Sequence, residues 1–372
     1  MKFSFTQSAI SRGLQRVIGA VSSKVPMPSL SNVHLKLDGQ MLSMTSTDLE
    51  LTITATVDLI DSEGQGGALV HAKRFQEIVN ALPDIPLEME IQEPFKVFLR
   101  GEGLGIYQLP GGDPIDFPDL PKVDPKVSIK IPCETLKRMI SKTIFAVSKD
   151  EMRPVLTGIL LQIRPGELRF VSTDGHRLSK ISREDGSQNI DARDDIIPMK
   201  ALNVLLKNLG DDEDVEINLS ETRASFTSPG QRLITRLIDG HYPKYESVIP
   251  KDNPNKLILR LSDFMSTLRR VSIFSSSISH QIKLSIDSNK VKIEAEDPEY
   301  GGRAQEELAV DYEGDPLDIA YNAVYLSESL RQIDTDEAVV SLLNANDAAI
   351  IKPIIQKEGE DFLMLLMPIR LR

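Results

Sequence analysis

The sequence contains a single cysteine, no tryptophan and only 5% aromatic residues. One cysteine excludes an intrachain disulfide and is typical of a reducing compartment. So few aromatic side chains argue against a surface on which nucleic-acid bases stack. No apolar run approaches the roughly 18 residues of a membrane span, and the N-terminal MKFSFTQSAI lacks the apolar core of a signal peptide. These absences predict a soluble, cytoplasmic protein without a membrane partner.

Motifs for catalysis, metal binding and nucleotide binding are also missing. The five histidines have no metal-ligand spacing, and the glycine-rich run at 101–105 fails the dinucleotide-binding pattern and predicts a hairpin turn. Cys133 lies at a predicted helix start, where its pKa would fall, but a buried residue is the favoured interpretation. The carboxylate run at 211–214 is interpreted as a solvated turn. We therefore expect no metal, no cofactor and no catalytic residue.

The 372 residues instead contain an internal repeat. Three alternating, strand-like segments at 2–5, 126–131 and 256–261 are each followed by a stretch with helical periodicity. The predicted helices span 7–24, 132–149 and 262–280. We expect them to be capped by Thr6, by Pro132 with Glu134, and by Ser262 with Asp263.

The remainder of each unit repeats as well. Strand–turn–strand patterns span 30–55, 156–182 and 280–308, with turn residues at Asp38-Gly39, Pro165-Gly166 and Asp287-Ser288-Asn289. A second helix is predicted near Ala72, Met199 and Asn322. The pattern indicates an α+β fold with mostly antiparallel sheets. It predicts three domains at 1–125, 126–252 and 253–372.

Charge is distributed unevenly along these units. The chain has 43 basic and 55 acidic residues and a net charge of −12, which by itself argues against a nucleic-acid partner. The six predicted helical segments carry +10, however, so the remainder carries −22. Solvated helix faces are the plain explanation. Because an excess of positive charge recurs in five of the six segments, we favour a basic track that binds a polyanion. Such a track would contact the phosphates only.

Two further segments suggest a binding function. The turn Thr173-Asp174-Gly175-His176-Arg177-Leu178 differs from its counterparts in the other units, which read TDLELT and EDPEYG. The C-terminal LMLLMPIRLR either completes a sheet or lines an adaptable partner groove.

With these motifs, and with Thr47-Asp48-Leu49-Glu50 and the run DGHYPKY at 239–245, the whole chain resembles the bacterial DNA polymerase III beta subunits, the sliding clamps. The resemblance implies three repeated clamp domains, each with two helices and antiparallel sheets. It also implies a head-to-tail homodimer that forms a six-domain ring around duplex DNA and tethers the replicative polymerase for processive synthesis. A clamp of this kind has no active site and works at replication forks, in the nucleoid region of the cytoplasm.

The resemblance assigns residues to the ring's surfaces. DNA-binding positions are Lys24, Arg74, Lys149 and Lys200, with Lys24 standing where the family commonly has arginine. The dimer interface combines Arg74, Ile78 and Leu82 of the first domain with Ile273 and Phe274 of the last.

The resemblance also implies one pocket that binds peptides of the polymerase catalytic subunit, the clamp loader and other clamp-binding proteins. Ser247 and Ser279 replace a familiar Arg and Phe at its rim, and Arg372 extends the usual ending. The pocket residues are Arg153, Leu156, Thr173, Gly175, His176, Arg177, Leu178, Pro243, Val248, Asn322, Tyr325, Met367, Pro368, Ile369, Arg370 and Leu371.

Two alternatives remain open from the residues alone. An enzyme with a site at the domain interfaces would use His176 and Arg177, and would lose activity on His176→Ala but keep it when residues 368–372 are deleted. A scaffold that never meets DNA is the other alternative, and retention on circular versus linear duplex distinguishes it from a clamp.

Overall fold

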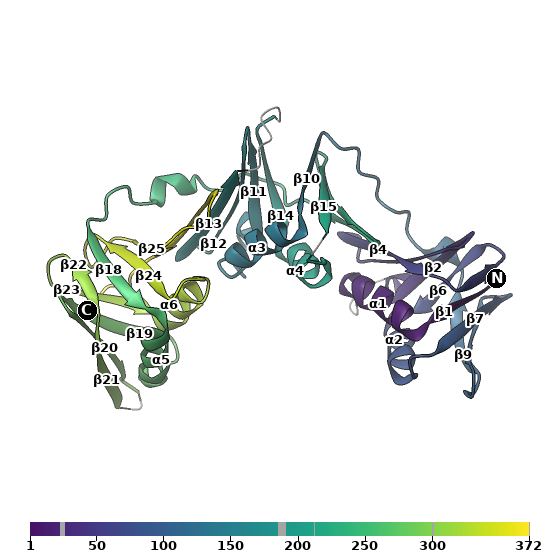
Figure 1. The fold of residues 1–372 in the computed structure, drawn as a ribbon, viewed down its shortest axis with the longest axis horizontal. Helices are drawn as coiled ribbons and strands as arrows, with labels where there is room; N and C mark the ends of the chain where they lie inside the picture. The colour runs from purple at the N-terminus through teal and green to yellow at the C-terminus, as the bar shows by residue number, and fades with distance from the viewer. Residues whose placement is uncertain (23–26, 185–190, 212, 300, 372) are drawn as a thin grey trace. The chain divides into compact units, whose positions relative to one another are not determined.

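A computed structural model describes residues 1–22, 27–184, 191–211, 213–299 and 301–371 (Figure 1). Lys24 and Arg372 lie outside the described residues. In the part of the chain that is described, no helix is long and apolar enough to cross a membrane.

The three sequence repeats fold into similar series of strands and helices. The first contains β1 (Lys2–Thr6), α1 (Gln7–Val17), β2 (Asn32–Asp38), β3 (Met41–Thr47), β4 (Leu51–Asp58), β5 (Asp61–Glu63), β6 (Gly66–His71), α2 (Ala72–Ala81), β7 (Pro86–Gln92), β8 (Lys96–Gly101) and β9 (Tyr107–Gly112). The second contains β10 (Val127–Pro132), α3 (Cys133–Ile144), β11 (Gly158–Arg164), β12 (Glu167–Thr173), β13 (Arg177–Glu184), β14 (Arg193–Pro198), α4 (Met199–Asn208), β15 (Asp214–Leu219), β16 (Arg223–Ser228) and β17 (Gln231–Arg236). The third contains β18 (Asn255–Arg260), α5 (Leu261–Val271), β19 (Gln281–Asp287), β20 (Lys290–Asp297), β21 (Gly302–Ala309), β22 (Asp311–Glu313), β23 (Leu317–Asn322), α6 (Ala323–Leu330), β24 (Glu337–Leu342), β25 (Ala349–Pro353) and β26 (Glu360–Leu366).

The repeated helices form where apolar residues recur at helical spacing. In α1, Ile10, Leu14 and Val17 are buried along one face. Gly13 lies on the same face, and a Cβ there would stand 2.7 Å from Val57 Cγ2 of β4. The glycine therefore lets the helix approach the sheet closely. The Thr6 side chain accepts a hydrogen bond from the Ala9 backbone N–H, which confirms the predicted N-cap.

The first helices of the repeats are shorter than predicted. α1 ends at Val17 and continues as a 3₁₀ turn, Ile18–Ala20, and α3 ends at Ile144. α5 ends at Val271 and is followed by the 3₁₀ turn Ser272–Phe274, because Ser272 and Ser275 bond nearby backbone carbonyls. The expected cap at Ser262 and Asp263 is wrong. α5 begins one residue earlier, and its N-cap residue, Arg260, makes no side-chain cap bond.

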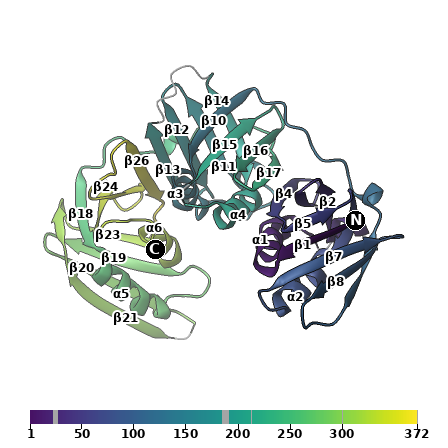
Figure 2. The same cartoon turned by 45° about the vertical axis from the view of Figure 1, so that its right-hand side comes forward.

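Antiparallel ladders join the repeats as well as build them. β17 pairs with β4, so strands of the middle and first repeats share a 13-stranded sheet within the described residues. β13 pairs with β26 over Arg177 to Arg183, so the middle and last repeats share a nine-stranded sheet. Figure 2 shows yellow β26 beside teal β13.

By contact density the chain divides into two compact units. One comprises Met1–Lys137 with Lys200–Leu237, and the other comprises Arg138–Met199 with Ile238–Arg372. The middle repeat is divided between them because each of its sheets continues into a neighbouring repeat. All of the predicted peptide-site residues belong to the second unit.

Candidate functional site

The turn that the sequence singled out, between β12 and β13, is held by its own side chains. The Thr173 hydroxyl accepts the Gly175 N–H at 3.1 Å and donates to the Arg177 carbonyl at 2.6 Å. The Asp174 carboxylate accepts the backbone N–H groups of His176 and Arg177 at 2.9 and 3.0 Å. Gly175 has φ +93°, a conformation that favours glycine. The turn is therefore rigid and leaves Gly175 and His176 exposed.

The same turn recurs in the first repeat. The Thr47 hydroxyl accepts the Leu49 N–H at 3.1 Å, and Asp48 accepts the N–H groups of Glu50 and Leu51 at 3.0 and 2.7 Å. Leu49, at the position of Gly175, has φ +78°. The structure thus places the two motifs in equivalent turns, as their alignment in the sequence suggested.

Arg177 is 7% exposed and is enclosed by groups from three parts of the chain. Its guanidinium pairs with Asp174 at 3.1 Å and with Glu328 of α6, and donates to the Phe145 carbonyl at 2.6 Å. Its Cζ atom lies 4.5 Å from the ring centre of Tyr325 and 5.2 Å from that of Phe145. Arg177 therefore connects the turn to α6 and positions its neighbours rather than presenting a charge to a ligand.

The C-terminal segment lies against this turn. The Met367 N–H donates to the His176 carbonyl at 2.9 Å, and the Ile369 N–H donates to Ala320 of β23 at 2.8 Å. The His176 ring stacks on Tyr325 with 6.2 Å between centres. Asn322 caps α6 by accepting the N–H groups of Val324 and Tyr325. The last residues are thus fixed beside the turn, with Met367, Arg370 and Leu371 exposed.

An apolar cluster supports the site from below. Leu178 packs there with Val171, Tyr245 and Leu365, among others, while Val155 and Tyr242 lie at its edge. The Tyr242 hydroxyl accepts the Thr173 N–H at 3.0 Å, and burial raises the pKa of Tyr242 well above its usual value. Burial likewise raises the pKa of Tyr245, to about 12. Both tyrosines are therefore neutral structural groups.

The remaining predicted residues lie in two loops, one before β11 and one after β17. Arg153 donates to the Asp174 carbonyl at 3.2 Å and pairs with Asp150 at 2.8 Å. Leu156 is buried, whereas Pro243 and Val248 are exposed. The structure therefore brings Arg153 and the C-terminal segment to one turn.

A cluster of charges near this site escaped the sequence analysis. Arg138 of α3 donates to both oxygens of Glu360, at 3.0 and 2.9 Å, and pairs with Asp334. Lys142, one helical turn later, pairs with Asp334 at 2.6 Å and donates to the Gln332 carbonyl. Treating Arg138 and Lys142 as part of an open basic surface was wrong, because both side chains are largely buried in this cluster of ion pairs. We call the cluster of Arg138, Lys142, Asp334 and Glu360 the ionic joint. Only the tertiary structure reveals it, since the partners are about 200 residues apart.

Lys142 and Asp334 within the joint have shifted pKa values. Burial lowers the pKa of Lys142, and the Asp334 carboxylate only partly opposes this. For Asp334 burial raises the pKa, but hydrogen bonds from Lys142 and Arg138 outweigh it and hold the pKa below its ordinary value. The Asp334 carboxylate is therefore in its charged form at neutral pH.

The predicted DNA-binding residues differ in their partners. Arg74 on α2 and Lys149 after α3 are exposed and form no ion pair within the described chain. Lys200 on α4 pairs with Asp48, the residue that organises the first-repeat turn. The charge of Lys200 is therefore partly neutralised.

The predicted dimer residues divide by exposure. Ile273 is 74% exposed and Phe274 is 41% exposed, and both lie in the 3₁₀ turn after α5. Ile78 on α2 is half-buried. Leu82 is only 7% exposed, so its side chain is largely buried in the single chain.

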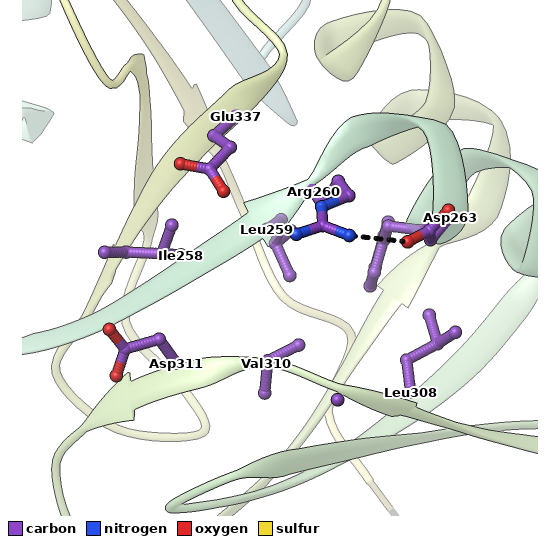
Figure 3. A pocket seen from close by; sticks show the side chains of 10 residues that line it. Ile258, Leu259, Arg260, Asp263, Leu308, Val310, Asp311 and Glu337 are labelled. Carbon is purple, nitrogen blue, oxygen red and sulfur yellow. Dashed lines mark ion pairs between the residues drawn. The ribbon is translucent and has the colours of Figure 1, made fainter.

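Other features lack the arrangement of a catalytic centre. A cavity of about 360 Å³ at the start of α5 combines aliphatic side chains with Asp311, Glu337 and a 3.8 Å ion pair between Arg260 and Asp263 (Figure 3). Among the described residues, no group of three or more His, Cys, Asp or Glu is placed to hold a metal. Cys133 is fully buried, and burial raises its pKa, so it is not an activated thiol. The run at 101–105 joins β8 to β9 as a hairpin, as predicted.

Models of three domains of one protein family match successive parts of this chain. The N-terminal domain of the DNA polymerase III beta subunit matches residues 1–121, the central domain matches 130–244 and the C-terminal domain matches 246–370.

Individual relatives match from end to end. The beta sliding clamp of Pseudomonas aeruginosa is 30% identical, and that of Bacillus subtilis is 29% identical, each over 100% of both chains. A crystal structure of the Pseudomonas aeruginosa sliding clamp bound to griselimycin superposes with a TM-score of 0.95 at 30% identity. The Bacillus subtilis polymerase sliding clamp superposes with a TM-score of 0.91 at 29% identity, and both structures are covered completely.

Proposed function

This chain belongs to the family of DNA polymerase III beta subunits, and from that premise we propose that two copies join head to tail in a closed, six-domain ring around duplex DNA. The family role is that of a sliding clamp, a non-catalytic processivity factor that tethers the polymerase. An enzyme built on His176 and Arg177 is therefore set aside. Tethering keeps a released polymerase at high effective concentration beside its template.

The observation that carries the ring proposal is an unpartnered apolar surface in the third repeat. Ile273 and Phe274 are exposed next to β21, and β21 is the edge strand of its sheet. Phe274 also lies close to Gly302 at the start of β21. An exposed apolar patch beside a free strand edge favours association with another chain. In the proposed ring this apolar surface meets the first repeat of the second copy. The residues assigned to that side of the interface are Arg74, Ile78 and the largely buried Leu82.

DNA binding in this proposal rests on a few separated cations. The proposed DNA contacts are Arg74, Lys149 and Lys200, together with Lys24, which lies outside the described residues. Sliding requires contacts that are weak and readily screened by salt, and isolated side chains provide these better than a dense basic patch. The duplex is therefore met through its phosphates, without sequence readout.

Partner recognition rests on the turn and the C-terminal segment. Val248, Met367 and Leu371 are exposed apolar residues, and Met367 lies directly beside the rigid turn that Arg177 holds in place. Apolar side chains of a short peptide gain by burial against such a preorganised surface. We propose that the polymerase catalytic subunit, the clamp loader and other clamp-binding proteins compete for this surface, at replication forks in the cytoplasm.

Retention on circular and linear duplexes tests the proposal. Protein loaded onto a closed circle is expected to stay through a high-salt wash, and cutting the circle once is expected to release it. Equal retention on both forms contradicts encirclement, and no retention on either contradicts DNA binding itself.

A further inference from the structure

The segment that joins β17 to β18 carries two exposed residues of the proposed peptide surface, Pro243 and Val248. No strand ladder holds this segment in place. In the part of the chain that the structure describes, the backbone–backbone hydrogen bonds of residues 239–252 stay within the segment itself. The position of Val248 therefore depends on the side chains of neighbouring residues.

Both tyrosines of the segment reach other parts of the chain through their hydroxyl groups. Tyr242 accepts the Thr173 N–H at 3.0 Å and so connects the segment to the turn between β12 and β13. Tyr245 is 3% exposed, and its hydroxyl donates to the Gln162 side-chain oxygen Oε1 at 2.6 Å. Tyr245 also begins the 3₁₀ turn that ends at Val248, so the anchoring of one residue fixes the other.

The partner groups of Tyr245 belong to a polar network on the sheet behind the segment. Gln162 of β11 is 4% exposed and lies directly opposite Arg169 of β12. Arg169 donates to the Tyr245 hydroxyl at 2.8 Å and to Gln162 Oε1 at 3.4 Å. The same guanidinium donates to both carboxylate oxygens of Glu167, at 3.0 Å each. The Tyr245 hydroxyl thus donates one hydrogen bond and accepts another, and both partners are fixed on the sheet.

This network specifies where the segment lies more strictly than apolar packing does. Ile249 packs against the apolar cluster, but hydrophobic contacts have no preferred direction. A shift of Tyr245 away from Gln162 and Arg169 leaves buried polar groups without partners, which is strongly unfavourable. The hydrogen bonds therefore favour one position of the segment. A surface that is ordered in advance binds a peptide more tightly, because less ordering accompanies binding.

We propose that Tyr245 is a positioning residue for partner recognition, which sets the position of Val248 through hydrogen bonds to Gln162 and Arg169. The tyrosine is too buried to contact a peptide itself. The assignment rests on the proposed function and deepens it, since it makes affinity for partner peptides depend on a polar network behind the exposed surface.

Two tyrosine-to-phenylalanine variants provide a matched test, because each removes one buried, hydrogen-bonded hydroxyl. Tyr245→Phe removes the hydroxyl of the network. Tyr312→Phe is the control, since Tyr312 is 5% exposed and donates to the Asp315 carbonyl at 2.8 Å, outside the peptide surface.

Peptide affinity is the first measurement. The probe is a fluorescein-labelled peptide with the clamp-binding segment of the replicative polymerase from the same organism, and anisotropy reports its binding to the full-length protein. Tyr245→Phe is expected to raise the Kd about three- to tenfold, the range that one hydrogen bond gives. Tyr312→Phe is expected to leave the Kd unchanged.

A double-mutant cycle with Val248→Ala separates positioning from a general loss of structure. Val248 is 56% exposed, so its truncation is expected to leave the fold intact. If Tyr245 acts through Val248, Tyr245→Phe weakens binding less in the Val248→Ala protein than in wild type. A general loss of structure has its full effect in both backgrounds.

The methyl NMR signals of Val248 report on the segment without any peptide. Tyr245→Phe is expected to shift or broaden them, and Tyr312→Phe is expected to leave them in place. Unchanged signals in Tyr245→Phe overturn the proposal. Equal losses of affinity in the two tyrosine variants, or a full effect of Tyr245→Phe on the Val248→Ala protein, overturn it as well. If the wild-type protein binds no peptide, the proposed function fails, whereas the Val248 signals still decide whether Tyr245 positions the segment.

Discussion

Leu49 and Gly175 occupy one position in two copies of the same turn, with φ values of +78° and +93°. The hydrogen bonds of the turn impose this conformation in both copies. Leucine adopts it at a cost of roughly 1–2 kcal/mol, whereas glycine adopts it freely but loses about 0.5–1 kcal/mol more backbone entropy on folding.

Leu49→Gly is therefore expected to stabilise the protein by about 0.5–1 kcal/mol, the difference between these two effects. Gly175→Ala is expected to destabilise it by about 1 kcal/mol, since a Cβ there would also stand 3.1 Å from Arg153 Nη1. Urea denaturation at fixed protein concentration measures both changes. Stabilisation by both substitutions, or by neither, would show that the turn does not impose the conformation.

Arg177 is the other residue whose role is local. In Arg177→Gln the Asp174 carboxylate, whose side chain is 13% exposed, loses its charged partner, and the Tyr325 and Phe145 rings lose the guanidinium between them. We expect a loss of about 3 kcal/mol and weaker binding of a clamp-binding peptide. Arg153→Gln, at an exposed ion pair, is the control for stability only and is expected to change stability by less than about 1 kcal/mol. Hydrogen exchange at β13 and peptide titration measure the two effects.

At the scale of elements, α3 shows how one helix serves two purposes. Lys137 pairs with the exposed Asp211, whereas Arg138, the next residue, pairs with Glu360, whose side chain is 2% exposed. Adjacent helical residues face different directions, so their charges have different energetic roles.

Arg138→Met is accordingly expected to destabilise β26 by about 3 kcal/mol, because among the described residues it leaves the buried Glu360 with Arg183 as its one remaining ion-pair partner. Lys137→Met removes the same charge from the same helix and is expected to cost at most about 0.5 kcal/mol. Amide exchange along β26 measures the difference. If the two variants exchange alike, the joint contributes no stability.

The ionic joint also gives a defined pH dependence. Because the pKa of Asp334 is lowered in the folded protein, its stabilisation is complete above the ordinary carboxyl range and is lost as the pH falls through the folded value. The melting temperature of wild type is expected to exceed that of Asp334→Asn at pH 7, and the gap is expected to close below about pH 4. Asp211→Asn, at an exposed pair, should differ little from wild type throughout. If the difference in melting temperature between wild type and Asp334→Asn were the same at every pH, the lowered pKa of Asp334 would not be the source of this stability.

At the scale of the whole molecule, association depends on residues that the single chain leaves exposed. Ile273→Lys is expected to weaken the dimer at least tenfold, since it replaces about 1.5–3 kcal/mol of burial with a charge at the interface. Ile355 is equally exposed, at 72%, and lies outside the predicted interface, so Ile355→Lys is the control. Sedimentation equilibrium measures both. A monomeric wild type, or equal effects of the two substitutions, would contradict the ring.

The sequence by itself determined what depends on local spacing and chain chemistry. The threefold repeat, the antiparallel α+β class, the Thr6 cap and the equivalence of the turns at Asp48 and Asp174 all follow from short-range patterns. The family resemblance added the choice of site residues, and the structure places Arg153, His176 and Met367 around one turn.

The tertiary structure alone decided which charges are open and which are buried. Arg138 and Lys142 have the same sequence signature as solvent-facing helix cations, yet they meet Asp334 and Glu360 from the far end of the chain. It also decided that Leu82 is buried, that Lys200 is paired, and that Tyr245 meets Gln162 and Arg169. The physical reason is that burial and pairing depend on neighbours brought together by folding, and no local pattern encodes the distance between residues 138 and 360.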